Sequence, residues 1–244
     1  MKSVLFIPDT HCPYHDAKAF DLVEQVARDL KPDITVILGD FADFYAVSSH
    51  MKDPSRRETF DEEVQATHKL LRRVESWSPR GRRLYLMGNH EDRLSRYIAG
   101  QAKEMHGIVT ADSLFGLTDH RWEITPYKRH TTLGKLYLTH DLGKAGANAV
   151  KDASTSYQDN IVIGHLHRMI YLIEGNAKGK PHVASCFGWL GDVKQVDYMH
   201  QVRANRDWAL GFGLGYLEAD GVAHLQPVPI VGYKCVVRGK IYAA

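Results

Sequence analysis

The stretch that decides the fold is KSVLFIPDTH, residues 2–11. Its apolar run VLFIP has no alternating polar positions, which is the pattern of a strand buried on both faces. Asp9 and His11 follow directly, so polar side chains stand where the predicted strand ends. The same sequence of buried strand and polar cluster recurs along the chain and predicts where a site would form.

The residues after this first strand predict a strand–helix–strand unit. Apolar residues recur at helical spacing from Phe20 to Leu30. Pro32 ends the helix, because proline disfavours helical backbone in the residue before it. Residues 33–38 (DITVIL) form a second buried strand. Such a unit favours a parallel strand pair with a right-handed crossover.

The rest of the chain continues in the same style. Thr59 and Glu62 have the spacing of a capping box, so a helix is predicted to begin there. Further strands are predicted at residues 83–87, 135–139 and 160–163, and a further helix at residues 92–99. The C-terminal third consists mainly of short β-like runs separated by turns rich in Gly and Asp.

No repeat, low-complexity tract or linker divides the chain, so residues 1–244 are predicted to form a single α/β domain. Residues 41–58 are long and polar, and are expected to form a surface excursion between a strand and a helix. The C-terminal part is expected to be rich in strands.

Composition excludes several classes of protein. Hydrophobic residues make up 44% and charged residues 25%, which excludes a disordered chain or a coiled coil. No apolar run is long enough for a membrane span or a secretory signal, so a cytoplasmic location is expected. Three cysteines do not make a disulfide framework, which agrees with a reducing compartment.

Polar clusters follow five of the predicted strands. They are Asp9-x-His11, Gly39-Asp40-x-x-Asp43, Gly88-Asn89-His90-Glu91, His140-Asp141 and Gly164-His165-x-His167. In an open α/β sheet, ligands bind outside the carboxyl ends of the strands, so these clusters are expected to converge. The glycines before the candidate ligands are expected to let the backbone turn sharply.

The donor types in these clusters predict a metal centre. Aspartate, asparagine and histidine offer oxygen and imidazole donors without thiolate, a set that suits Mn, Fe, Zn, Co or Ni. Seven candidate ligands exceed what one ion takes from protein when water and substrate must also bind. Two ions that share a bridging carboxylate account for the number, and such a centre activates water and clamps a phosphoryl oxygen.

In this order, the motifs resemble those of the calcineurin-like metallophosphoesterase superfamily, and in particular its small prokaryotic and phage phosphodiesterases. The match consists of DxH, GDxxD, GNHE, a single histidine and GHxH, and it spans residues 9–167. The resemblance implies a four-layer α/β/β/α sandwich, in which two mixed β-sheets are flanked by helices. It also implies two divalent metal ions, with manganese favoured.

The resemblance assigns a role to each residue of the motifs. The implied metal ligands are Asp9, His11 and His167 for the first ion, Asp40 as the bridge, and Asn89, His140 and His165 for the second ion. A metal-bridging hydroxide would attack phosphorus in line. His90 would not bind metal; it would stabilise the developing charge or protonate the leaving oxygen.

Residues beside the motifs are candidates for supporting contacts. Asp43, Glu91 and Asp92 are candidates to orient the ligand histidines. Arg93 and Arg96 follow the GNHE cluster within two turns of the predicted helix, and are candidates to face a phosphate chain. The competing interpretation of these two arginines is a solvated helix face.

The substrate is left open among several classes. The flanking glycines and the DRG segment of the protein Ser/Thr phosphatases are absent, which favours a phosphodiesterase with DNA or RNA as substrate. The formal charge of only +2 weakens a nonspecific nuclease, since backbone binding draws on Lys and Arg. The alternatives are a cyclic nucleotide or nucleotide polyphosphate, a phosphomonoester, or a non-catalytic metal-binding scaffold. Independently of the substrate, the strand-rich C-terminal part could offer an edge through which two copies of the chain pair into an oligomer.

Overall fold

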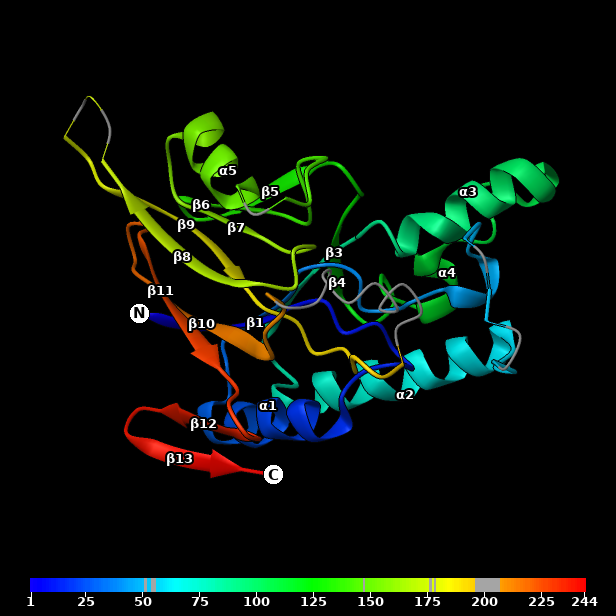
Figure 1. Ribbon diagram of the computed structural model, residues 1–244, viewed down its shortest axis with the longest axis horizontal. Helices are drawn as coiled ribbons and strands as arrows, with labels where there is room; N and C mark the ends of the chain where they lie inside the picture. Colours follow the sequence, from blue (N-terminus) through cyan, green and yellow to red (C-terminus); the bar gives the residue numbers. More distant parts are fainter. Residues whose placement is uncertain (51, 54–55, 147, 176, 178, 196–206) are drawn as a thin grey trace.

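The computed structural model describes residues 1–50, 52–53, 56–146, 148–175, 177, 179–195 and 207–244. Two mixed β-sheets lie face to face, with helices on their outer sides (Figure 1). The α/β class with two mixed sheets, predicted from the sequence, is therefore confirmed. Among the described residues, no helix is both long and apolar enough to cross a membrane.

The first sheet has six strands in the order β11-β10-β1-β2-β3-β4. Their bounds are β1 Lys2–Ile7, β2 Ile34–Ile37, β3 Arg82–Leu86, β4 Trp122–Thr125, β10 Gly211–Leu217 and β11 Ala223–Pro229. Strands β1 to β4 are parallel, and β10 and β11 add antiparallel neighbours. The carboxyl ends of β1, β2 and β3 therefore meet at one edge, and the predicted parallel pair of β1 and β2 is confirmed.

The second sheet has five strands in the order β5-β6-β7-β9-β8. Their bounds are β5 His130–Leu133, β6 Leu136–Thr139, β7 Ile161–Ile163, β8 Met169–Glu174 and β9 His182–Phe187. Strands β6, β7 and β9 are parallel, while β5 and β8 run antiparallel at the edges. The carboxyl ends of β6 and β7 are therefore neighbours.

The helices are α1 Ala17–Leu30, α2 Phe60–Trp77, α3 Glu91–Gln101, α4 Ala111–Phe115 and α5 Ala149–Tyr157, with 3-10 turns η1 Tyr45–Val47 and η2 Lys103–Met105. Helix α2 begins at Thr59, whose side chain and that of Glu62 form the predicted capping box. The segment 41–58, predicted as a polar surface excursion, contains η1, and residues 51 and 54–55 of it lie outside the described part of the chain. The prediction was wrong for residues 41–44, which are buried because they pack beside the loop that follows β1.

Three apolar cores separate four layers. Phe20 of α1 and Leu71 of α2 pack with Leu5 of β1 on the outer face of the first sheet. Between the two sheets, Phe6 meets Phe187 with ring centroids 5.2 Å apart. Helix α5 covers the outer face of the second sheet. The central strands β1, β2 and β7 are thus covered on both faces, which is why they read as continuous apolar runs, whereas the edge strands β5, β8 and β11 are partly exposed.

The chain ends in a hairpin of β12 Lys234–Val237 and β13 Lys240–Ala243, which forms a sheet of its own. Cys235, Val237 and Tyr242 join the apolar core that contains α1. The hairpin lies beside α1, away from the carboxyl ends of the parallel strands (Figure 1).

Candidate metal centre

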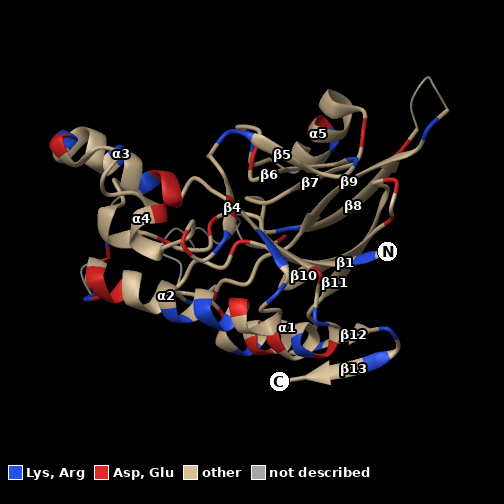
Figure 2. Ribbon diagram, turned by 180° about the vertical axis from the view of Figure 1, so that it is seen from behind, with Lys and Arg blue, Asp and Glu red and all other residues tan. Residues whose placement is uncertain are grey.

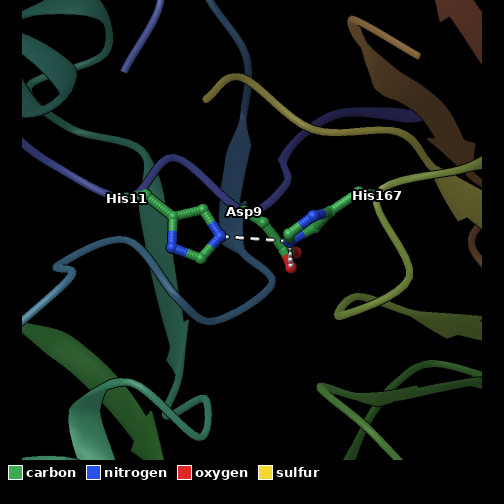
Figure 3. Close-up of side chains that lie close together, drawn as sticks. All are labelled: Asp9, His11 and His167. Carbon is green, nitrogen blue, oxygen red and sulfur yellow. Dashed lines mark hydrogen bonds and ion pairs between the residues drawn. The ribbon is translucent and has the colours of Figure 1, made fainter. Parts of the chain in front are cut away.

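Asp9, His11 and His167 form one cluster of donor atoms (Figure 3). Asp9 and His11 come from the loop after β1, and His167 comes from the loop after β7. Nε2 of His167 lies 3.0 Å from Nε2 of His11 and 3.1 Å from Oδ2 of Asp9. The two motifs are far apart in the sequence but share one point in space.

A second cluster lies beside the first and consists of Asp40, His140 and His165. Nε2 of His140 lies 3.3 Å from Oδ2 of Asp40 and 3.1 Å from Oδ1 of Asn89. Each cluster has its donor atoms within 4.8 Å of one another, and a third such cluster of His11, Asp40 and His90 lies between them. All seven predicted ligands therefore gather in one place, with Asp40 in the middle.

The electrostatics of the buried carboxylates favour a cation. Burial alone raises the pKa of Asp40, but the charges of His140 and His90 outweigh it and hold that pKa well below its usual range. Burial alone lowers the pKa of His140, but Asp40 outweighs it and raises that pKa to about 10. The carboxylates stay ionised in the interior, so they require positive charge beside them.

Two further observations show that these residues fit a divalent metal. Oδ2 of Asp9 is buried without a hydrogen bond of good geometry among the described residues, so a lone pair is free for a ligand bond. Burial lowers the pKa of His167 to about 4, which keeps its imidazole neutral, the form that coordinates metal, whereas His140 would give up the proton that Asp40 stabilises when an ion takes its place. Oxygen and imidazole donors without thiolate suit Mn, Fe, Zn, Co or Ni.

The backbone at this centre is strained. Four candidate ligands have left-handed backbone, namely His11 (φ 53°), Asp40 (φ 48°), His165 (φ 67°) and His167 (φ 56°). Such a conformation costs a residue other than glycine about 1–3 kcal/mol and persists only where its surroundings hold it. The amides of Thr10 and His11 both donate to the carbonyl of Asp40, at 2.9 and 2.8 Å, and thereby hold the two loops together.

The motif glycines serve two different purposes. Gly39 has φ +100° and does turn the backbone sharply, as the sequence predicts. Gly88 instead provides room, because a Cβ there would lie 2.0 Å from Oδ1 of Asp40. The expectation of a turn at every glycine was thus too simple, since close approach of two loops is a tertiary property.

His90 sits between Asp43 and Arg93. Its amide donates to Oδ1 of Asp40 at 2.8 Å, and its Nδ1 lies 3.1 Å from the carbonyl of Asp43. Nη2 of Arg93 lies 2.9 Å from Nε2 of His90, and Nη1 donates to Oδ1 of Asp43 at 3.0 Å. Arg93 is therefore buried inside the centre and does not face solvent. Oδ2 of Asp43 also lies 3.1 Å from Nδ1 of His11.

Glu91, Asp92 and Arg96, the other predicted supporting residues, form no hydrogen bond or ion pair with the side chains of the candidate ligands, which all belong to the described part of the chain. Glu91 touches backbone: its carboxylate accepts from the amides of Asp40, Phe41, Ala42 and Gly88 and from the Tyr85 hydroxyl. It thus holds the loop that carries Asp40. Arg96 pairs with Asp92 at 3.0 Å on an exposed helix face and donates to the carbonyl of Asn89 at 3.3 Å.

Sequence reasoning missed the aromatic wall beside His167. The Trp189 ring stacks on His167 with centroids 4.8 Å apart, and the Trp208 ring meets it edge-on at 4.2 Å. Trp189 follows the end of β9 as the ligands follow their own strands, and this position is the one signal that would have identified it. Nothing in the sequence around Trp208 marks it.

Glu63 was also missed, because it reads as an ordinary helix glutamate. Its two carboxylate oxygens accept from the amides of Tyr45 and Ala46 at 2.8 and 2.9 Å. Burial raises the pKa of Glu63 to about 7. Glu63 therefore holds the loop after Asp43 much as Glu91 holds the loop at Asp40.

Known proteins with similar sequences place the chain in a family. The family model described as "Calcineurin-like phosphoesterase" matches residues 2–169. The Gene 54 protein of Mycobacterium phage D29 is 29% identical over 274 residues, which cover 99% of this chain and 98% of that protein. The Gene 54 protein of Mycobacterium phage L5 is 26% identical over 272 residues, with the same coverage.

A solved structure shows the fold alone. Vacuolar protein sorting 29 from Cryptosporidium parvum aligns with a TM-score of 0.50 at 14% identity, over 100% of this chain and 95% of that one. The family match covers more than half of the chain and includes every predicted ligand. This chain therefore belongs to the calcineurin-like phosphoesterase family, and its membership and its His/Asp clusters support metal-dependent phosphoester hydrolysis.

Proposed function

We propose that this protein is a phosphodiesterase that uses two divalent metal ions, with nucleic acid as the favoured substrate. The observation that carries the proposal is the position of Asp40, which belongs both to the cluster with His11 and to the cluster with His140 and His165. One carboxylate between two sets of donors is the arrangement that two neighbouring ions need.

In this proposal the donors divide into two sets around Asp40. Asp9, His11 and His167 hold one ion. Asn89, His140 and His165 hold the other, and Asp40 serves both. Bound together, the ions supply an activated water and neutralise charge on the phosphoryl group.

The role of His90 follows from its surroundings. Its Nε2 faces the Arg93 guanidinium and its Nδ1 faces Asp43, so its ring is held from both sides. His90 is proposed to donate to the phosphoryl group or to the leaving oxygen as charge develops, which requires its Nε2 to be protonated and to turn from the Arg93 guanidinium toward the substrate. Arg93, which contacts both His90 and Asp43, is proposed to position His90 and to add positive charge beside the reacting group.

A polyanionic substrate such as nucleic acid is favoured because a cationic side chain lies beyond the metal ligands. The Arg56 guanidinium lies 4.2 Å from the Tyr14 ring and 4.5 Å from the Tyr45 ring. Tyr14 follows His11 and Tyr45 follows Asp43, so this cation is held on the two loops that carry parts of the centre. A substrate whose chain continues to a second phosphate beyond the scissile one would contact it.

The test compares hydrolysis of bis-(p-nitrophenyl) phosphate and p-nitrophenyl phosphate, with Mn²⁺ and with chelator. We expect faster cleavage of the diester and loss of activity with chelator. Single-stranded DNA, RNA and cyclic nucleotides then compete against the chromogenic diester, and nucleic acid is expected to compete best. Metal analysis of the purified protein identifies the ion, with manganese expected.

His90→Ala and His224→Ala form a matched pair for this test. His224 is exposed and pairs with Glu218 at the surface, so its replacement is expected to leave turnover unchanged. His90→Ala is expected to lower kcat while metal content is retained. Preference for the monoester would replace the phosphodiesterase proposal with a phosphomonoesterase. If metal-loaded protein hydrolyses neither substrate, the non-catalytic scaffold would be favoured.

A further inference from the structure

A hollow of about 340 Å³ lies at the opposite end of β3 from the metal centre. It is bounded by the end of α2, by the start of β3 and by the turn before β4. Three arginines line it, Arg72, Arg83 and Arg121, together with Glu75, Asp119 and His120. Figure 2 shows both basic and acidic segments along α2.

Arg83 carries a charge that no carboxylate neutralises directly. It is buried, and its guanidinium donates, among the described residues, to carbonyls alone: those of His120 at 3.2 Å, Pro79 at 3.0 Å, Ser78 at 3.3 Å and Glu75 at 3.5 Å. Within the described part of the chain, no Asp or Glu oxygen lies at ion-pair distance from it. These bonds close the end of α2, but carbonyls carry no net charge and leave the positive charge in place.

Glu75 offsets part of the charge of Arg83 from a distance, but its carboxylate oxygens are bonded to other partners. Oε2 accepts from Arg72 at 2.8 Å and lies 3.1 Å from Nδ1 of His120. Oε1 accepts from the indole of Trp122 at 2.8 Å. Burial, opposed by Glu75, lowers the pKa of Arg83, and the charges of Arg121 and Arg72 act in the same direction.

Two arginines at the hollow can contact a ligand. Nε of Arg72 is buried and has no hydrogen-bond partner among the described residues, while other atoms of its half-buried side chain are accessible. The side chain of Arg121 is exposed, and no described residue forms a hydrogen bond or an ion pair with its guanidinium. Guanidinium groups match oxyanions because they present paired donors in a plane.

We propose that this hollow is a second binding site, for the phosphate group of a small molecule, held by Arg121 and Arg72 against the buried charge of Arg83. Asp119 stands at the exposed rim and limits the charge that the site accepts. The site lies beyond the metal centre and does not depend on the catalytic proposal. Free inorganic phosphate and the phosphate of a mononucleotide share the required chemistry.

The four tryptophans allow the two sites to be followed separately. The indole of Trp122 bonds Glu75 at the hollow, while Trp189 and Trp208 pack on His167 at the metal centre. Inorganic phosphate is titrated into ¹⁵N-labelled protein loaded with Mg²⁺, and the indole N–H signals are recorded. The Trp122 signal is expected to shift and saturate with a phosphate dependence different from that of the Trp189 and Trp208 signals.

Arg121→Asn is the decisive variant, because asparagine tolerates the left-handed backbone found at Arg121 (φ 61°). It is expected to weaken phosphate binding at Trp122 by about tenfold, which is the loss of one charge-assisted contact. The phosphate affinity of Arg121→Lys is expected to lie between those of the unaltered protein and Arg121→Asn, since lysine keeps the charge but loses the paired donors. Asp40→Asn is expected to leave the Trp122 curve unchanged.

Arg238→Asn is the matched control, because it removes an exposed arginine that also has left-handed backbone (φ 51°) and that, within the described part of the chain, bonds the Tyr216 hydroxyl alone. A Trp122 signal that does not move at cellular phosphate concentrations would overturn the proposal. Equal affinity in Arg121→Asn and Arg238→Asn would also overturn it. Adenosine monophosphate distinguishes the ligand sources: tighter binding than inorganic phosphate identifies a nucleotide, and equal binding identifies free phosphate.

Discussion

The two ends of the candidate metal centre offer similar donor side chains but hold them differently. Nδ1 of His140 lies 2.8 Å from the carbonyl of Leu38, so a hydrogen bond fixes that ring. Nδ1 of His167 has no partner among the described residues, and its ring instead packs against Trp189 and Trp208, which also contact each other. A ligand histidine can thus be oriented by a hydrogen bond or by packing.

The ends also differ in exposure. Asp9 and His11 are both 0% exposed at the end walled by tryptophan, which we call the closed end. His165 and Asn89 are half-buried at the other end, which we call the open end. We therefore infer that the closed end holds its ion more firmly, while the open end admits substrate.

The largest expected effect comes from Asp40→Asn, because Asp40 belongs to both ends. Loss of this carboxylate is expected to reduce turnover by more than about 100-fold, the upper range for changes in residues that only support a ligand. Metal titration by calorimetry is expected to show both ions weakened. Asp220→Asn removes an exposed carboxylate and is the control. Near-normal turnover in Asp40→Asn would rule out the shared role.

Asp43→Asn is expected to affect the closed end alone. It removes the carboxylate that lies 3.1 Å from Nδ1 of His11 and that also pairs with Arg93. The more tightly bound ion is expected to weaken by about 10–100-fold, with the second ion little changed. Asp152→Asn, which breaks an exposed pair with Lys144, is the control. Equal weakening of both ions would mean that the ends are not separable.

Trp189→Phe tests whether packing orients His167. Aromatic contacts contribute about 0.5–1.5 kcal/mol beyond buried area, so the closed-end ion is expected to weaken by about two- to tenfold. Trp77→Phe is the matched control, since Trp77 is buried against Phe20 away from the centre. If both variants weaken the ion alike, general loosening of the fold explains the result and packing on His167 does not.

Tyr127→Phe is expected to have the smallest effect. The Tyr127 hydroxyl donates to Asp141 at 2.7 Å, and its ring lies 6.4 Å from that of His140. Because His140 keeps its bond to Leu38, we expect less than about a threefold change in affinity for either ion. A larger loss at the open end in the same calorimetric titration would show that aromatic support operates at both ends.

The sequence predicted the strands and the ligands because both depend on local pattern. The run before Asp9 is apolar throughout, and the run before Asp40 is interrupted only by Thr35, so both read as buried strands. The capping box at Thr59 also marked the start of α2. Arg93 could be placed near the site, but its burial against His90 and Asp43 depended on how the loop after β2 folds over α3.

What the sequence alone determined was the order of strands and polar clusters, and hence the family and the donor types. These are properties of residues next to one another in the chain. Tertiary structure alone decided that Glu91 and Glu63 bind loop amides, that Trp189 and Trp208 close one end, and that Arg83 is left without a carboxylate. Each of these depends on which segments meet across the sheets, and a glutamate, a tryptophan or an arginine carries no local pattern that names its distant partner.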